Sequence, residues 1–356
     1  GQEMKKKVEG WRKTVASAMG CEAKQLYFTS CGTEGDNWAI SAACWQNRHL
    51  GKHVVTTAVE HSAVRVTCQW LEQQGYEVTY LKPDRTGHVT VEQVANALRE
   101  DTVLVSMMLV NNETGALYSV GEAFGKIKRR YPDAITHCDA IQGFMRVSFT
   151  PATLKADMIS VSGHKLHAPK GIGMLFIRKG VVIGNLIEGG GQERRKRGGT
   201  ENLPYIVGLA KALEMAKENM KYLPEVAAKR DRLIKELTKI PYSSLNGHPT
   251  KRLPGLVNIG FEFIEGESML MWLDMMGICA STGSACSSAS LDASHVLLAI
   301  GVPHEKAHGS LRLSISKDTT DEDIDYIIEN VAPIVEKLRN MSPLWEEIVK
   351  KEKINK

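Results

Sequence analysis

The first half of the chain alternates between strand-like and helix-like segments, and this alternation constrains the fold more than any other feature. Short apolar runs that predict strands lie at 25–30, 53–58, 77–82, 102–110, 135–140, 158–162 and 173–179. Helical patterns lie between many of them, at 34–48, 62–75, 90–100 and 120–131, the third beginning with a capping box from Thr90 to Gln93. Such alternation is typical of a mainly parallel central sheet with helices on both faces.

The pattern changes after about residue 205. A long helical stretch over 206–240 is interrupted by Pro224, and short strands are expected within 255–263 and 310–317. A final helix over 321–340 follows a predicted capping box from Thr319 to Glu322, and its apolar residues recur at helical spacing. We therefore expect two domains, a large one over 1–223 and a smaller α+β domain over 224–356.

Composition excludes several classes of protein. The 356 residues are 43% hydrophobic and carry a net charge of +4, which gives no reason to expect nucleic acid or membrane as a partner. The seven cysteines have irregular spacing and form no C-x-x-C, so neither a disulfide framework nor a structural zinc site is expected. No apolar run reaches the roughly 18 residues of a membrane span. The first residues lack the apolar segment of a signal peptide, so we expect a cytoplasmic location.

Two motifs are interpreted as chance or as ordinary surface. The segment "HEKAH" over 304–308 matches the zinc-protease pattern, but Pro303 and Gly309 enclose it, so its helix would be too short, and no metal is expected. The basic run "RRKR" over 194–197 would suit RNA or phosphate binding, but it is interpreted as a solvated face of an interface loop, and no direct nucleic-acid binding is expected.

Polar residues follow the predicted strands, at the edge of the sheet where ligands of such folds bind. The turn of Gly32 and Thr33 suits a phosphate, although a threonine there is also an ordinary helix cap. His61 follows the second strand, where a capping histidine is the plainer interpretation. Asp139 ends an apolar strand, and Lys165 follows another strand after a Ser-Gly-His turn, where its amine could form a Schiff base. Pyridoxal phosphate needs these four functions together, so their shared position predicts that cofactor.

The motifs as a set closely resemble the pyridoxal-phosphate cysteine desulfurases. They are "FTSCGTEGDN", "EHSAV", "VNNETG", "CDAIQG", "SGHKLHAPKGIG", "GGGQERRKRGGTEN" and "STGSACSSAS", and the similarity extends over nearly the whole chain. The resemblance is to the subgroup with a long catalytic loop and implies a fold-type I transferase. Where the family usually has Gly-Ala, this chain has Cys31 and Gly32, and Cys31 is expected to be a small buried filler.

The resemblance also implies roles for single residues. Lys165 would hold the cofactor as a Schiff base, Asp139 would pair with its ring nitrogen, and His61 would stack on the ring and move protons. The remaining cofactor contacts would come from Gly32, Thr33, Asn112, Gln142, Ser162 and His164, together with Thr200 from a neighbouring subunit, which implies a homodimer. Asn112 and Arg312 would bind the substrate, and Arg312 would hold its carboxylate. The Cys286 thiolate would be the nucleophile.

The implied reaction converts L-cysteine to L-alanine and leaves a persulfide on Cys286. The persulfide sulfur would pass to a protein acceptor, such as an iron–sulfur scaffold or a tRNA-thiolation enzyme. Alternatives are a selenocysteine lyase or another fold-type I enzyme of this cofactor. In the family, roughly forty residues precede the position of Gly1. If the protein lacks that segment and needs it for catalysis, a non-enzymatic sulfur-relay role is a further alternative.

Overall fold

The computed structural model describes residues 1–283 and 293–354 of the chain. They divide into two compact units. The large unit contains 1–82, 89–111 and 118–220, and the small unit contains 83–88, 112–117 and 221–356. The small unit therefore includes two short segments from the first half of the sequence. The boundary between residues 223 and 224 stays a prediction.

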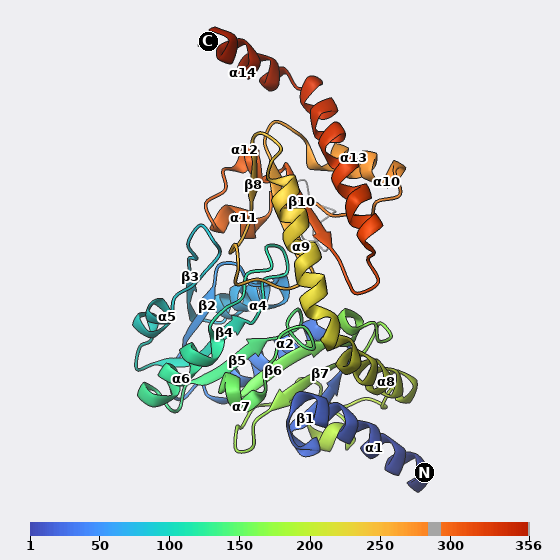
Figure 1. The fold of residues 1–356 in the computed structure, drawn as a ribbon. Coiled ribbons are helices and arrows are strands. Elements are labelled where there is room, and N and C mark those ends of the chain that lie inside the picture. The colour runs from blue at the N-terminus through green and yellow to red at the C-terminus, as the bar shows by residue number, and fades with distance from the viewer. Residues whose placement is uncertain (284–292, 355–356) are drawn as a thin grey trace. The chain divides into compact units, whose positions relative to one another are not determined.

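The large unit is built on a seven-stranded sheet in the order β1-β7-β6-β5-β4-β2-β3 (Figure 1). Its strands are β1 (Leu26–Thr29), β2 (His53–Thr57), β3 (Glu77–Leu81), β4 (Thr102–Met108), β5 (Ile135–Asp139), β6 (Met158–Ser162) and β7 (Gly173–Ile177). Strands β2 to β6 pair in parallel, and β7 runs antiparallel to its neighbours β6 and β1. The predicted mainly parallel sheet is confirmed.

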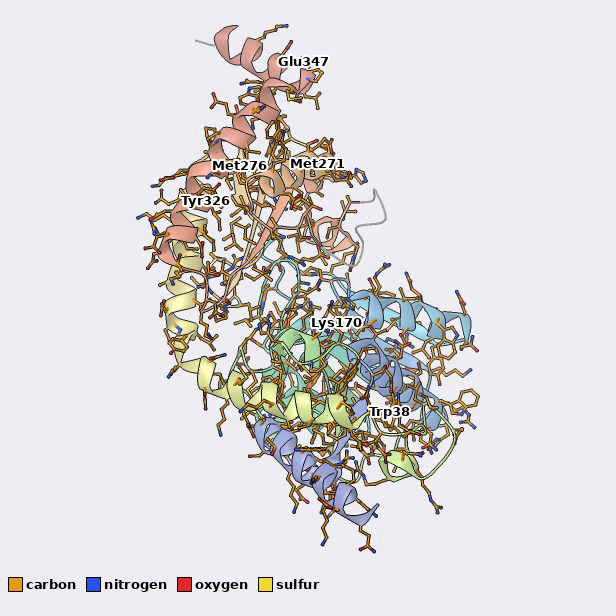
Figure 2. The ribbon with its side chains drawn as sticks, turned by 90° about the vertical axis from the view of Figure 1, so that its right-hand side faces the viewer. Trp38, Lys170, Met271, Met276, Tyr326 and Glu347 are labelled. Atoms are coloured by element: carbon orange, nitrogen blue, oxygen red, sulfur yellow. The ribbon has the colours of Figure 1, made fainter. Side chains whose placement is uncertain are left out.

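Helices cover this sheet and bury its apolar strands. They are α1 (Gln2–Met19), α2 (Gly32–Asn37), α3 (Ala43–Gln46), α4 (Ser62–Gln73), α5 (Val91–Ala97), α6 (Val120–Arg130), α7 (Pro151–Leu154) and α8 (Leu203–Asn219). A π-helical turn over Trp38–Ala42 joins α2 to α3 and places Trp38, labelled in Figure 2, in the core with no exposed surface. Within the described ranges, no helix combines the length and apolar character needed to cross a membrane.

The small unit contains a three-stranded antiparallel sheet, with β9 (Leu256–Phe261) between β8 (Ser243–Leu245) and β10 (Ser310–Ser314). Its helices are α9 (Leu223–Leu237), α10 (Gly266–Met275), α11 (His295–Ala299), α12 (His304–Ala307), α13 (Asp321–Asn340) and α14 (Pro343–Ile354). The core includes Val257 and Ile259 of β9 and Ile324 of α13, which are fully buried. Met271 and Met276 lie on and directly after α10, and the Tyr326 hydroxyl of α13 donates to the Met276 carbonyl at 3.1 Å (Figure 2).

The sequence predictions for helix ends can now be compared with the structure. The Thr90–Gln93 capping box is confirmed. The predicted Thr319–Glu322 box is wrong by one residue, because the Thr320 side chain accepts the Asp323 amide while the Thr319 hydroxyl accepts the Ser316 amide. The break near Pro224 is confirmed: α8 ends at Asn219, and Pro224 lies in the first turn of α9.

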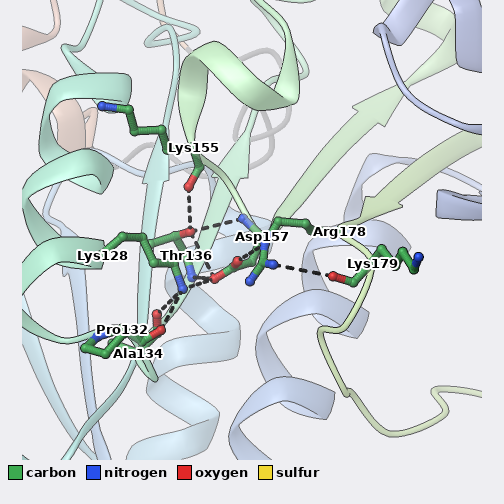
Figure 3. A network of polar contacts seen from close by, with 8 residues as sticks. All are labelled: Lys128, Pro132, Ala134, Thr136, Lys155, Asp157, Arg178 and Lys179. Atoms are coloured by element: carbon green, nitrogen blue, oxygen red, sulfur yellow. Dashed lines mark hydrogen bonds and ion pairs between the residues drawn. The ribbon is translucent and has the colours of Figure 1, made fainter.

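A network of polar contacts lies at the end of the sheet where β6 begins (Figure 3). At its centre is Asp157, which is 1% exposed and accepts hydrogen bonds from the amide of Thr136 at 2.9 Å and from Nε of Arg178 at 2.7 Å. The Lys128 ammonium also pairs with this carboxylate. These side chains line a pocket of about 410 Å³. Because the pocket lies at the start of the parallel strands, it is remote from the edge where the sequence predicts chemistry.

Candidate active site

The opposite edge of the sheet gathers the predicted phosphate residues around Gly32. Gly32 is the first residue of α2, and a Cβ atom on it would lie 2.3 Å from Cδ1 of Ile141 and 3.2 Å from Cβ of Ser162. Any larger residue would force the Ile141 side chain to move. The turn after β1 therefore lies against the ends of β5 and β6, with Thr33 exposed as the next residue.

Cys31, directly before Gly32, differs from its predicted role. It is half-buried rather than buried, and it is the N-cap residue of α2, where its sulfur accepts the Glu34 amide at 3.4 Å. The expectation of a buried filler is wrong, because a thiol at an N-cap can satisfy a free amide of the first helical turn.

Asp139 and Lys165 are brought together at the ends of neighbouring strands. Asp139 ends β5, is 4% exposed and accepts the Ile141 amide at 2.9 Å. Burial raises the pKa of Asp139 to about 6, while the Ile141 hydrogen bond and the charge of Lys165 act in the opposite direction. A carboxyl group so placed gains from any further positive charge that reaches it.

The turn that carries Lys165 is held by side-chain hydrogen bonds. It is a short 3₁₀ helix, Gly163–Leu166, directly after β6, where the Ser162 hydroxyl and Nδ1 of His164 lie 2.8 Å apart. Burial, followed by the charge of Lys165, lowers the pKa of His164. Arg146 donates to the Lys165 carbonyl at 2.8 Å and to Oε1 of Gln142 at 3.3 Å. Arg146 thus links two predicted site residues, and no sequence pattern points to it.

His61 is the N-cap residue of α4. Its Nδ1 accepts the Ala63 amide at 3.1 Å, so the neutral ring carries its proton on Nε2. The plainer interpretation, a capping histidine, is confirmed, and the ring also lies at the predicted strand end. The cap fixes the tautomer of a histidine that would act in proton transfer.

Three buried ionisable residues behind this edge were missed by the sequence reasoning. Glu60 and Asp36 have no exposed surface. Burial raises the pKa of Glu60 to about 8 and the pKa of Asp36 well above its usual range, and nearby Asp139 raises both pKa values further.

His137 is the third of these residues. Its ring contacts the hydroxyls of Ser106 and Ser160 at 2.8 and 2.9 Å and lies 3.6 Å from Asp36. Burial lowers the pKa of His137 to about 3, so its ring is neutral. Glu60 directly precedes His61, which is the one sequence signal that could have identified it.

The small unit holds the two predicted substrate residues side by side. Arg312 lies in β10 and donates through Nη1 to the Asn112 carbonyl at 3.1 Å. Asn112 is 8% exposed, and its buried Oδ1 has no hydrogen-bond partner in the described part of the chain. A buried amide oxygen without a partner is rare in folded proteins and suits a ligand donor. Cys286, the predicted nucleophile, lies outside the described residues.

The loop that carries Thr200 is tied to the rest of the large unit. Glu193 pairs with both terminal nitrogens of Arg12 at 2.7 and 2.8 Å, and Arg197 pairs with Glu34 at 2.8 and 3.1 Å. Within the basic run, Arg194 and Arg195 are exposed as predicted for a solvated face, whereas Arg197 is used in an ion pair inside the unit. Thr200 itself is exposed and lines a pocket of about 210 Å³.

Comparison with known proteins identifies the chain. Residues 1–327 match the family model "Aminotransferase class-V". Over 97% of its length, the chain is 51% identical to "Cysteine desulfurase IscS" of Methanosarcina thermophila, of which it covers 85%. The chain belongs to the cysteine desulfurases of the class-V aminotransferase family. It is accordingly a pyridoxal-phosphate-dependent enzyme, as the sequence motifs predicted.

Solved structures of cysteine desulfurases and related proteins share this fold. A protein titled "NIFS-LIKE PROTEIN" superimposes with a TM-score of 0.88 at 34% identity, covering 95% of this chain and 90% of its own. SspA, solved in complex with cysteine, has a TM-score of 0.77 at 31% identity, with 88% of each chain covered. The predicted fold class is confirmed.

The residues at the candidate site of this desulfurase fit pyridoxal phosphate. The buried Asp139 carboxyl offers a partner for a protonated ring nitrogen, and Lys165 offers the amine. The missing Cβ of Gly32 leaves backbone accessible beside Ser162. These features are the donor and acceptor types that the cofactor requires.

Proposed function

We propose that this enzyme converts L-cysteine to L-alanine and takes the sulfur onto Cys286. The observation that carries the proposal is the placement of Lys165 beside the buried Asp139 at neighbouring strand ends. Pyridoxal phosphate, when bound there, would supply an electron sink that makes the substrate sulfur open to attack.

The large unit would hold the cofactor through residues with separate tasks. The Lys165 amine would bind its aldehyde, and the Asp139 carboxylate would hold a proton on its ring nitrogen. Gln142, fixed by Arg146, would donate to the ring hydroxyl. Its phosphate would bind at Gly32, Thr33, Ser162 and His164, with Thr200 supplied by a second copy of the chain. His61 would stack on the ring and take part in proton transfer, with its Nε2–H as the donor.

The small unit would orient the substrate. Arg312 would grip the cysteine carboxylate through its planar guanidinium, and the Asn112 side chain would take part in cofactor and substrate binding. Arg312 is preoriented for this task because its Nη1 is already fixed on the Asn112 carbonyl. Preorientation lowers the entropy that binding would otherwise cost.

The sulfur step then belongs to Cys286. Its thiolate attacks the sulfur of the bound cysteine, an S–S bond forms as the C–S bond breaks, and the electron pair stays with the substrate carbon. That carbon takes a proton and leaves as the methyl group of alanine. The persulfide on Cys286 would next transfer its outer sulfur to a thiol of an acceptor protein. An iron–sulfur scaffold and a tRNA-thiolation enzyme both meet that description.

The proposal includes a homodimer in the cytoplasm. Thr200 is exposed on a loop flanked in sequence by the exposed apolar side chains of Ile187 and Tyr205, which suits a contact with a second copy. The described cysteines are all free, which suits a reducing compartment.

An absorption spectrum of the purified holoenzyme, before and after L-cysteine is added, tests the function. We expect a Schiff-base band that shifts with cysteine, and release of alanine with sulfur. Cys286→Ser should keep the band and its shift but abolish sulfur release. Sulfur release at the wild-type rate by Cys286→Ser would refute the nucleophile assignment. A strong preference for selenocysteine over cysteine would favour the lyase alternative.

A further inference from the structure

Gly283 and Ser294, which lie on either side of the gap in the described residues, are close together in the small unit. A Cβ atom on Gly283 would lie 3.7 Å from Cβ of Ser294 and 3.4 Å from Oε2 of Glu113. Oε2 of Glu113 also accepts a hydrogen bond from the Ser294 hydroxyl. The Glu113 carboxylate therefore hydrogen-bonds to one end of the segment in whose sequence Cys286 lies and is a near neighbour of the other end, Gly283.

Each of these two ends is fixed to a regular element. Before Gly283, the backbone of Ser281 exchanges hydrogen bonds with that of Arg312 at 3.1 and 2.6 Å, and the Ser310 hydroxyl donates to the Thr282 carbonyl. After the segment, Ser294 is the N-cap residue of α11 and accepts the Leu297 amide at 3.2 Å. Glu113 thus hydrogen-bonds to the N-cap residue of α11 and lies beside Gly283, the residue that follows the backbone pairing with β10.

Glu113 is itself held in a buried position. It is 1% exposed, and its carbonyl accepts a hydrogen bond from Nδ2 of Asn258 on β9 at 3.0 Å. Burial raises its pKa, while the Ser294 hydrogen bond and the charges of His295 and Arg312 act in the opposite direction. Cofactor and substrate binding have been assigned to its neighbour Asn112 and to Arg312, but no role has been assigned to Glu113.

We propose that Glu113 is a positioning residue for sulfur transfer, which holds together the two chain ends that flank Cys286 and ties them to the strand carrying Arg312. The inference rests on the proposed function, because it acts through Cys286. It concerns the step in which Cys286 meets the substrate sulfur and not the earlier binding of cysteine. Glu113 touches neither substrate nor cofactor in this proposal.

The test separates these two steps in the holoenzyme of Glu113→Ala. The shift of the absorption band on adding L-cysteine reports substrate binding, and the rate of persulfide formation on Cys286 reports sulfur transfer. We expect persulfide formation to fall by about 10- to 100-fold, as for the loss of a buried hydrogen bond to a charged group. The cysteine concentration that half-saturates the band shift should stay close to the wild-type value.

Two further variants keep the proposal falsifiable if the alanine variant folds poorly. Glu113→Gln should recover most of the rate, because its amide oxygen can accept the Ser294 hydroxyl. Ser294→Ala should lower the persulfide rate in the same direction, and adding it to Glu113→Ala should cause little further loss. Equal loss of the band shift and the persulfide rate, no loss of either, or full additivity in the double variant would each overturn the proposal.

The failure of the proposed function would look different. In that case the wild-type enzyme would form no persulfide, or Cys286→Ser would still release sulfur. If wild type and Cys286→Ser behave as proposed while Glu113→Ala transfers sulfur at the wild-type rate, the positioning role alone is refuted.

Discussion

Two buried aspartates lie at opposite ends of neighbouring strands in the large unit, and their surroundings differ. Asp157, directly before β6, meets the cations of Lys128 and Arg178 and accepts the Thr136 amide at 2.9 Å. Its charge is neutralised within the fold. A carboxylate that already meets two cations and an amide does not need a further positive charge from a ligand.

The ionisable side chains near Asp139, at the end of β5, are mainly acidic. Asp139 accepts one amide, from Ile141, feels the charge of Lys165, and interacts electrostatically with the buried Asp36 and Glu60. The comparison teaches that burial alone does not mark a functional carboxylate. A functional carboxylate is distinguished by surroundings that can accept one more positive charge. For Asp139 this charge would be the protonated ring nitrogen of the cofactor.

The comparison is tested most strongly by Asp139→Asn. Losing the carboxylate should lower kcat/KM for cysteine by about 100-fold or more, because a preorganised electrostatic partner of the reacting group is lost. The thermal midpoint of the apoenzyme should not fall, since a poorly compensated buried charge is removed. Steady-state alanine release and thermal unfolding would measure the two effects. An inactive variant whose apoenzyme was also strongly destabilised would contradict the distinction drawn here.

Asp157→Asn is the matched variant at the other end of the sheet. It leaves the charges of Lys128 and Arg178 without their carboxylate, so we expect a loss of about 2–4 kcal/mol in the free energy of unfolding. Urea denaturation would measure the loss. Activity per folded molecule should stay near the wild-type value, and a selective loss of kcat without destabilisation would contradict the structural role.

Glu60→Gln tests the acidic surroundings of Asp139 through the pH dependence of the free energy of unfolding. Because the pKa of Glu60 rises from 4.5 to about 8 on folding, its protonated form favours the folded state. That contribution is fully present below pH 4.5 and is lost as pH rises towards about 8. The glutamine variant should therefore lose less stability over this range, by roughly 1–3 kcal/mol. Urea midpoints across the range would show it, and an unchanged slope would refute it.

Arg178→Gln should have the smallest effect. The Arg178 side chain is 52% exposed, so its pair with Asp157 is screened by water, and we expect a loss of about 0.5 kcal/mol. A loss as large as that of Asp157→Asn would mean that Arg178, rather than Lys128 and the Thr136 amide, carries most of the Asp157 network.

Much of the site was predictable because strand ends are local features. Apolar runs identify the strands; Asp139 lies at the end of one of them, and Lys165 comes shortly after another. A capping box is also local, but "TTDED" contains two threonines with an acidic residue three positions later, so the sequence could not choose between Thr319 and Thr320.

Residues that act through distant contacts could not be found in this way. Arg146 reaches the Lys165 carbonyl from the turn after β5, and Glu113 reaches Ser294 across 181 residues of sequence. The grouping of 112–117 with the small unit also depends on distant pairing, such as the Leu117 amide with the Lys251 carbonyl. No periodicity or spacing encodes such pairs.

The most direct test of the account is the protonation state of the cofactor's ring nitrogen. Holoenzyme containing nitrogen-15-labelled pyridoxal phosphate would be measured by NMR near neutral pH, for the wild type and for Asp139→Asn. The account predicts a protonated ring nitrogen in the wild type and an unprotonated one in Asp139→Asn, with Asp157→Asn resembling the wild type. An unprotonated ring nitrogen in the wild type would contradict the role given to Asp139.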